Sequence, residues 1–204
     1  MWWRNCMSKP LLIVFLRKPE LGKVKTRLAA TVGDEKALAI YCELLEHTLG
    51  STTGLQCTKQ AWYAGEGAVE DQVGPCGFLI CAQVGNDLGE RMLKAFTEGF
   101  EHGYGPVMII GTDCPGITSV ILKDALASME QHDAVLGPAR DGGYYLLGLK
   151  APLEAVFQNK EWSTSSVAKD TLEDLELHGR SVHLLPELID VDTEQDLRDT
   201  GMLA

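Results

Sequence analysis

The sequence predicts an α/β fold with a mostly parallel central sheet and helices on both faces. Two observations support this prediction. Short apolar runs of strand length alternate along the chain with segments whose apolar residues recur at helical spacing. The 204 residues are also enough for one sizeable core, and no repeat, linker or low-complexity segment divides them. We therefore expect one domain over residues 8–204, preceded by a short N-terminal extension, residues 1–7.

Seven apolar runs have the length and composition of strands. The run Val107–Ile110 is entirely apolar, as in a strand that is buried on both faces. Gly142 and Gly143 stand between two of the runs, which is typical of a hairpin, so we expect a small antiparallel segment there. The predicted strands are Leu11–Leu16, Gln60–Ala64, Phe78–Ala82, Val107–Ile110, Ala134–Leu136, Tyr144–Leu149 and Val182–Leu185.

Four longer segments show the helical pattern and carry signals at their ends. Asp34 is the expected N-cap of the first, and Gly50 stands at its C-terminal end. Asp87 and Glu90 have the spacing of a capping box before the second. A further helix is expected from about Thr193. The longer helices are predicted over Asp34–Leu49, Leu88–His102, Thr118–Gln131 and Ser165–His178.

The composition argues against several classes of function. The formal net charge of -11 disfavours a nucleic-acid partner, because such proteins usually carry a basic face, but it leaves small phosphorylated ligands open. No apolar run approaches the length of a membrane span, and the first residues lack a signal-peptide core. The six cysteines include no Cys-x-x-Cys pair, which argues against a zinc site. We therefore expect a cytoplasmic protein with reduced thiols.

The loop after the first predicted strand is rich in basic residues. In open α/β sheets the ligand lies beyond the carboxyl ends of the strands, where this loop would open. Together with the N-terminus of the next helix, the loop suits a diphosphate or triphosphate, although its spacing is not that of a P-loop. A solvated basic loop is the alternative. Its five cations and its turn-forming glycine are Arg17, Lys18, Gly22, Lys23, Lys25 and Arg27.

A carboxylate stands at the end of the predicted strand Val107–Ile110. Asp113 is followed by Cys-Pro-Gly, which does not continue a strand, so Asp113 either caps a turn or holds a ligand. Mg²⁺ typically takes one or two carboxylates and completes its shell with phosphate oxygens and water. A second carboxylate is therefore needed. Asp190 and Asp192 are the candidates, although Asp192 or Thr193 is also a natural cap for the last helix.

Three other stretches carry candidate residues. Asp141 precedes the glycine pair of the predicted hairpin, and such a pair also lets the backbone approach a ligand closely. Trp162 is either an aromatic wall of a pocket or a core residue before a helix cap. Gln83 follows the third predicted strand and is a candidate for ligand contact.

Read in order, the motifs are KPELGKVKTRL, GNDLGERM, GTDCPG, GPARDGGYYLLGL, WST and DVDTEQDL. This series resembles the bacterial GT-A-like transferases called selenodomain- or radical-SAM-associated transferase 1, within the nucleotide-diphospho-sugar transferase superfamily. The resemblance runs from about Leu11 to Leu197. Each motif alone is weak, and six in order are specific for the family, though less so for the reaction. It implies a Rossmann-like GT-A fold, a nucleotide at the carboxyl edge of the sheet, and Mg²⁺ or Mn²⁺ as cofactor.

The resemblance also implies roles for particular residues. GT-A enzymes usually carry Asp-x-Asp after a central strand, whereas here only Asp113 matches the metal-binding position. Asp192, with Asp190 as the fallback, matches the residue that meets the same metal in related nucleotidyltransferases. Lys25–Arg27 resembles the phosphate-gripping loop of pyrophosphorylase-type enzymes and of 2-phospholactate guanylyltransferase. Nucleotide or phosphate binding is thus expected for the basic loop, Thr26, Gln83 and Thr112, and acceptor-side contacts for Gly142, Gly143, Tyr144 and Trp162.

We expect a metal-dependent transferase that moves a sugar from a nucleotide-diphospho-sugar to an acceptor, as the family description implies. A nucleotidyltransferase that joins a nucleoside triphosphate to a small phosphorylated acceptor is the alternative. The basic loop favours it, since a triphosphate must be held at its far end. Asp113 and Asp141 are the expected catalytic residues, and Asp141 would serve as base for an acceptor hydroxyl in either reaction.

A third possibility is a nucleotide-binding module without turnover, which the missing second carboxylate of the Asp-x-Asp motif suggests. This possibility loses support if Asp190 or Asp192 lies within reach of an ion bound by Asp113. The expected partners are a nucleotide and a small-molecule acceptor, with no nucleic acid and no membrane span. A homodimer stays open, with Ala134–Leu149 as an edge that pairs with a second copy.

Overall fold

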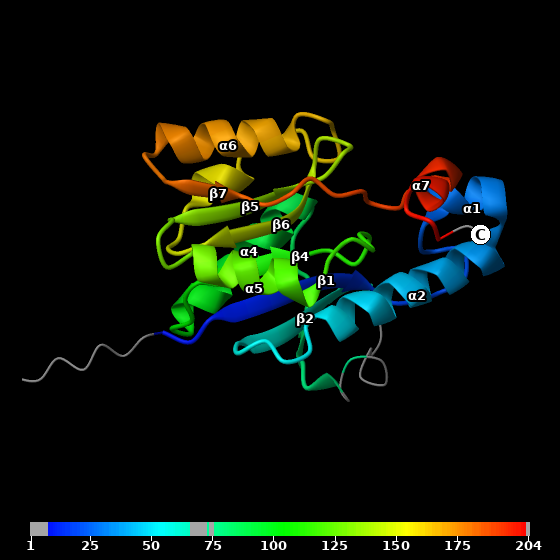
Figure 1. Ribbon diagram of the computed structural model, residues 1–204, viewed down its shortest axis with the longest axis horizontal. Helices are drawn as coiled ribbons and strands as arrows, with labels where there is room; N and C mark the ends of the chain where they lie inside the picture. Colours follow the sequence, from blue (N-terminus) through cyan, green and yellow to red (C-terminus); the bar gives the residue numbers. More distant parts are fainter. Residues whose placement is uncertain (1–7, 66–72, 74–75, 203–204) are drawn as a thin grey trace, which may run out of the picture.

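The computed structural model describes residues 8–65, 73 and 76–202 (Figure 1). Its centre is a seven-stranded sheet in the order β3-β2-β1-β4-β6-β5-β7. Neighbouring strands pair in parallel except at β6, which is antiparallel to both β4 and β5. The strands are β1 Leu11–Arg17, β2 Thr58–Ala64, β3 Leu79–Ala82, β4 Val107–Ile110, β5 Ala134–Pro138, β6 Tyr144–Leu149 and β7 Val182–Leu184.

Helices cover both faces of the sheet, as the sequence predicts. α2 and α5 pack on one face, and α4, α6 and the 3-10 helix η2 pack on the other. Side chains of β1 point alternately into the two cores, which explains why this central strand is apolar from Leu11 to Leu16. The helices are α1 Thr26–Val32, α2 Asp34–Ser51, α4 Leu88–Glu101, α5 Ser119–Ser128, η2 Glu154–Phe157, α6 Val167–Leu177 and α7 Glu194–Asp199.

A third, smaller core joins α1, α2 and α7. Figure 1 shows α1 and α7 together at one end of the molecule, beyond the sheet. Leu28 of α1, Leu44 of α2 and Leu197 of α7 are buried in this core, and Val191 joins them from the segment before α7. The small core therefore brings the basic loop of the N-terminal part next to the acidic segment of the C-terminal part.

The predicted fold class is confirmed, and two local predictions, the cap of α2 and the free edge at Ala134–Leu149, are wrong. Gly33, at φ +85, is the N-cap of α2, and Asp34 lies in the first turn, where its carboxylate faces the positive end of the helix. Of the two residues expected to cap α7, Asp192 and Thr193, the structure has Thr193 in that role. Ala134–Leu149 forms no free edge, because β6 lies between β4 and β5 while β5 lies between β6 and β7. The predicted helix ends differ from the observed ones by a few residues, as is usual at fraying termini.

Two predictions from composition agree with the described part of the chain. No helix in it is long and apolar enough to cross a membrane. Its cysteines, Cys42, Cys57, Cys76, Cys81 and Cys114, are free thiols. The predicted extension, residues 1–7, lies outside the described residues together with Cys6.

Candidate active site

A cavity of about 750 Å³ opens at the edge of the sheet where β1, β2 and β4 end. β6 runs antiparallel to its neighbours, so its first residue, Tyr144, lies at this same edge and lines the cavity. The hairpin between β5 and β6 thus meets the loops that follow β1 and β4. A cavity of this size accommodates a nucleotide-sized ligand, and its place matches the rule for open α/β sheets.

A lysine joins two carboxylates on the wall of this cavity. Lys25 Nζ lies 2.6 Å from Asp113 Oδ1 and 3.3 Å from Asp192 Oδ1, so those two oxygens are separated by no more than the sum of these distances. Arg27 Nη1 lies 3.2 Å from the other oxygen, Asp192 Oδ2. Only 4% of the Lys25 side chain is exposed, whereas 48% of the Asp113 side chain is. Asp192 therefore provides a second carboxylate beside Asp113.

The surrounding backbone holds Lys25, Asp113 and Asp192 in position. Lys25 adopts a left-handed conformation, φ 47, immediately before α1. Val24 before it and Leu28 after it are buried, which anchors the loop on both sides. The N–H of Val191 donates a 2.9 Å hydrogen bond to the carbonyl of Asp113, which joins the loop after β4 to the segment before α7.

Asp190 adds a further carboxylate to the same wall. Burial, followed by repulsion from Asp113, Asp141 and Asp192, raises the pKa of Asp190 to about 7, although Lys25 acts against this rise. The negative charge of the cluster is therefore only partly balanced by the protein's own cations. The Cys114 thiol hydrogen-bonds to Asp190, and burial together with that carboxylate raises its pKa to about 12. Cys114 thus stays protonated and is a poor nucleophile.

The chemistry of these side chains suits a hard divalent cation. Carboxylate oxygens are the ligands that Mg²⁺ prefers, and one or two of them suffice when substrate phosphates complete the shell. Asp113 and Asp192 already share one cation, the Lys25 ammonium. Among the described residues, no group of three or more His, Cys, Asp or Glu is arranged to hold a metal ion by itself. The site therefore fits an ion that is held jointly by two carboxylates and a phosphate ligand.

The basic loop divides into two parts. Lys18 and Lys23 pair with Glu20, at 3.4 and 2.6 Å, and these ammonium groups lower the pKa of Glu20. Lys25 and Arg27 instead face the carboxylates of the cavity. The helix that follows, α1, has only seven residues, so its dipole contributes less to phosphate binding than the sequence suggests.

Tyr41 is a site residue that sequence reasoning missed. Its hydroxyl accepts a 2.8 Å hydrogen bond from the Arg17 N–H and donates a 2.7 Å bond to the Arg17 carbonyl. It is also hydrogen-bonded to the side chain of Thr112, and burial raises its pKa to about 12. Tyr41 thus fixes the ends of β1 and β4 relative to each other. Its helical spacing in the sequence indicates burial but does not reveal this polar contact.

The hairpin glycines are explained by packing. Gly142 has φ +89, and a Cβ there would lie 2.1 Å from the Ser165 carbonyl oxygen. The carbonyl of Gly142 also accepts a 2.9 Å hydrogen bond from the N–H of Ala168 in α6. Asp141 Oδ1 accepts a 2.8 Å bond from the Gly143 N–H, which closes the turn, and Asp141 lines the cavity. The proposed role of Asp141 as a base stays a prediction.

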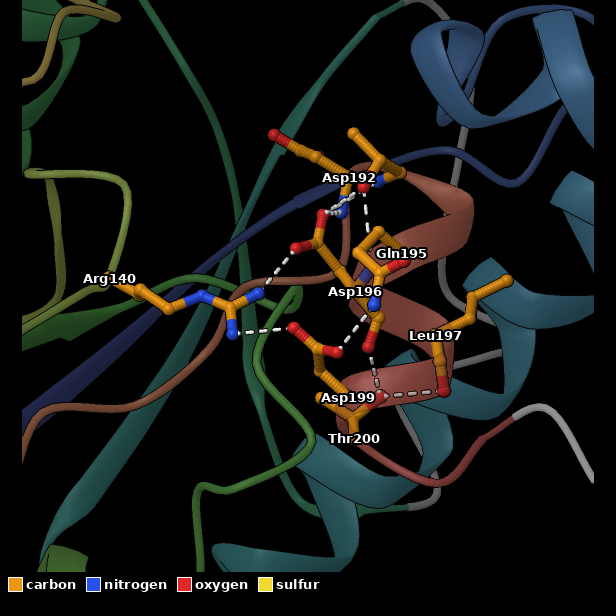
Figure 2. Close-up of polar contacts among 8 residues, drawn as sticks. Arg140, Asp192, Gln195, Asp196, Leu197, Asp199 and Thr200 are labelled. Atoms are coloured by element: carbon orange, nitrogen blue, oxygen red, sulfur yellow. Dashed lines mark hydrogen bonds and ion pairs between the residues drawn. The ribbon is translucent and has the colours of Figure 1, made fainter.

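Arg140 extends from the same hairpin to α7, as Figure 2 shows. Its guanidinium bonds to Asp196 Oδ1 at 2.9 Å and to Asp199 Oδ2 at 2.6 Å. The other oxygen of Asp196 accepts bonds from the backbone N–H groups of Asp192 and Thr193. Arg140 therefore holds the carboxylate that in turn holds the backbone of Asp192, which explains why an arginine stands beside the glycine pair.

The cavity also has an apolar part of its lining. Phe15, Met92, Tyr144 and Trp162 form this part. The Trp162 indole lies directly on α4, because a Cβ at Gly89 would lie 2.3 Å from its Nε1. Trp162 therefore serves as a cavity wall and also packs against the core, so the two interpretations of its motif are compatible.

Gln83 has a structural role beside its place on the cavity wall. Its Nε2 donates hydrogen bonds to the carbonyls of Trp62, at 2.9 Å, and Leu16, at 3.3 Å. Three predicted site residues, Lys18, Gly22 and Gly142, do not line the cavity. The predicted site residues that do line it are Arg17, Lys23, Lys25, Thr26, Arg27, Gln83, Thr112, Asp113, Asp141, Gly143, Tyr144, Trp162, Asp190 and Asp192.

Comparisons with known proteins agree with this fold. Residues 51–164 match the family described as "Uncharacterized protein conserved in bacteria (DUF2064)". The crystal structure of a "putative nucleotide-diphospho-sugar transferase" from Desulfovibrio desulfuricans G20 is similar, with a TM-score of 0.89 and 34% identity. That similarity covers 95% of this chain and 87% of the other. A search of curated proteins gave no match.

More distant structures share the fold alone. The 4-diphosphocytidyl-2C-methyl-D-erythritol synthase of Anaerococcus prevotii DSM 20548 has a TM-score of 0.60 at 11% identity, over 96% of this chain and 95% of that one. Rv0371C of Mycobacterium tuberculosis H37Rv, in complex with manganese, has a TM-score of 0.54 at 12% identity, over 94% and 97%. The narrower resemblance to selenodomain-associated transferases stays a prediction. The chain belongs to the DUF2064 family of bacterial proteins, within the nucleotide-diphospho-sugar transferase superfamily, and is a transferase.

Proposed function

We propose that this transferase moves the sugar of a nucleotide-diphospho-sugar to an acceptor with the help of Mg²⁺ or Mn²⁺. The observation that carries the proposal is the shared contact of Lys25 with Asp113 and Asp192 at the carboxyl edge of the sheet. The contact sets two carboxylates beside basic groups, an arrangement that supports the binding of a diphosphate together with a divalent cation. The relative with 34% identity carries the corresponding name.

The residues of the cavity divide the work between two walls. Asp113 and Asp192 would hold the divalent ion, which when bound would neutralise negative charge on the leaving diphosphate. Arg27, with 73% of its side chain exposed, binds phosphate oxygens from the cavity rim. The acceptor lies against Tyr144 and Trp162, and Asp141 takes the proton from its hydroxyl. Positioning and electrostatics thus provide most of the rate enhancement.

A nucleotidyltransferase is the second candidate, and the cations of the basic loop favour it. In that reaction a phosphorylated acceptor attacks the α-phosphate of a nucleoside triphosphate, and pyrophosphate leaves. The pairing of Lys18 and Lys23 with Glu20 satisfies two of these cations within the loop, so we rank this candidate second. The hypothesis of a nucleotide-binding module without turnover loses support, because Asp192 supplies a second carboxylate close to Asp113.

A thermal-shift panel of nucleotide-diphospho-sugars and nucleoside triphosphates, each with and without Mn²⁺, tests the proposal first. A ligand that binds only the folded state raises its melting temperature. We expect a metal-dependent shift with a nucleotide-sugar that Asp113→Asn abolishes. The matched control is Asp124→Asn, the same change at an exposed carboxylate of α5 outside the cavity. The absence of any shift with every nucleotide would overturn the proposal.

Products then separate the two reactions. Phosphorus NMR of the reaction mixture detects a nucleoside diphosphate after glycosyl transfer and pyrophosphate after nucleotidyl transfer. We expect the nucleoside diphosphate. Pyrophosphate as the product would establish the second candidate in place of the first.

A further inference from the structure

We propose that the Lys25 ammonium and a divalent cation are alternative occupants of the space between Asp113 and Asp192, so that the arriving cation releases Lys25 toward the phosphates of the bound nucleotide. The inference rests on the proposed function, because it assigns the cation to these two carboxylates. It goes beyond that function by giving the protein's own lysine a second position.

The geometry makes the two occupants mutually exclusive. Lys25 Nζ lies 2.6 Å from Asp113 Oδ1 and 3.3 Å from Asp192 Oδ1, and the remaining oxygen of Asp192 faces Arg27. A Mg²⁺ ion binds its oxygen ligands at about 2.0–2.1 Å, so an ion shared by these two oxygens would compete with the ammonium group for the space between them. An ion that used both carboxylates would also face the positive charge of Lys25 at close range.

The carboxylates are open to the cavity while the lysine is enclosed. The exposed fractions of the Asp113 and Asp192 side chains are 48% and 37%, against 4% for Lys25. A cation from solvent can therefore reach the carboxylates without unfolding the loop. A lysine has a flexible four-carbon stem and three rotatable donors, so its head can move while its backbone stays in place.

The released ammonium has a suitable partner nearby. Lys25 lines the cavity beside Thr26 and Arg27, at the wall where a diphosphate would lie. A phosphate group there would pair with the ammonium that the cation has displaced. Cation and nucleotide would then bind cooperatively, and by linkage each would strengthen the binding of the other to the same degree.

Lysine footprinting on the unmodified protein tests this directly. The protein is treated with an amine-acylating reagent in EDTA, in Mn²⁺, and in Mn²⁺ with a nucleoside diphosphate, and each lysine is quantified by mass spectrometry. We expect Lys25 acylation to rise several-fold in Mn²⁺ and to fall again with the nucleotide. Lys160 is the internal control, because its Nζ lies 2.6 Å from Asp174 Oδ2 and its side chain is only 2% exposed. Its acylation should stay low throughout.

A binding measurement provides the second test. The affinity for Mn²⁺ is measured by electron paramagnetic resonance without nucleotide, in the wild type, Lys25→Met and Lys160→Met. We expect Lys25→Met to bind Mn²⁺ at least tenfold more tightly than the wild type and Lys160→Met to match the wild type. Asp113→Asn should weaken Mn²⁺ binding in both the wild-type and the Lys25→Met backgrounds.

The outcomes separate this inference from the proposed function. The inference is overturned if saturating Mn²⁺ leaves the acylation of Lys25 unchanged. It is also overturned if Lys25→Met and the wild type bind Mn²⁺ with equal affinity. If Mn²⁺ exposes Lys25 but no nucleotide is bound or consumed, the exchange of Lys25 for the cation stands, whereas its coupling to phosphate binding falls together with the proposed function. If nucleotide-sugar is consumed while Lys25 stays protected from acylation, the proposed function stands and the inference about Lys25 falls.

Discussion

Asp190 makes the stability of the folded chain depend on pH. Its pKa is raised from 3.8 to about 7, chiefly by burial and then by the neighbouring carboxylates. The folded state therefore binds this proton more tightly than the unfolded state does. The resulting contribution to stability is fully present below about pH 4 and is lost as the pH rises to about 7.

We expect Asp190→Asn to remove this loss, because asparagine stays neutral. The variant should gain stability relative to the wild type as the pH rises from 4 to 7, by roughly 2 to 4 kcal/mol in all, given about 1.4 kcal/mol for each pKa unit. Urea denaturation in EDTA at pH 5 and pH 8 measures this difference. A difference of the same size at both pH values would contradict the prediction.

Gly89 is required because the Trp162 indole packs against α4 at this position, and not because of the geometry of the helix. In an unobstructed helix, Gly→Ala stabilises by roughly 0.5–1 kcal/mol. At Gly89 the added Cβ would lie 2.3 Å from Trp162 Nε1. We expect Gly89→Ala to destabilise the protein and to shift its tryptophan fluorescence. Gly50→Ala is the matched control, since nothing lies within 4 Å of its Cβ position, and it should stabilise. Equal effects of the two substitutions would refute this account.

At the scale of elements, Arg140 connects the β5–β6 hairpin to α7. We expect Arg140→Met to lower the melting temperature only modestly, because both of its ion pairs are partly exposed to solvent. It should also reduce the metal-dependent thermal shift with nucleotide, since the Asp192 backbone depends on Asp196. Arg198→Met removes an arginine–glutamate pair within α7 and should leave that shift unchanged. The prediction fails if both variants respond alike to the nucleotide.

The sequence predicts elements well where the signal is local. Apolar runs identify the strands, and the glycine pair identifies the hairpin, because both signals depend on neighbouring residues. The Tyr41 contact with Arg17 and the Arg140 contact with α7 join residues far apart in the chain. Periodicity shows which face of a helix is buried, not which polar atom it meets there. The choice between Asp192 and Thr193 as cap likewise required the structure.

At the scale of the whole molecule, the small core of α1, α2 and α7 links the stability of the fold to the assembly of the site. We expect Leu197→Ala to destabilise the protein by roughly 2–4 kcal/mol, as cavity-forming changes do. It should also weaken nucleotide binding. Leu122→Ala, at an equally buried residue of the α2–α5 core, should cost similar stability but leave nucleotide affinity at low temperature unchanged. Thermal melts and calorimetric titration measure the two effects.

The predicted class of fold follows from the alternation of strands and helices, and the structure confirms it. The position of the cavity follows too, because the ends of parallel strands meet at one edge. The sequence alone cannot show that the side chain of Lys25 is less exposed than those of Asp113, Asp192 and Arg27 around it. That fact depends on packing between α1 and α7, which are far apart in the sequence.

The hydrogen bond from the Val191 N–H to the Asp113 carbonyl has a consequence for biosynthesis. All seven strands precede Val191 in the chain, and so does the basic loop. A nascent chain that has emerged from the ribosome as far as β7 already contains the sheet, whereas Asp190 and Asp192 are still to come. Asp190 and Asp192 are therefore translated after the other residues of the cavity, and a chain released early would carry the basic loop and Asp113 without these two carboxylates.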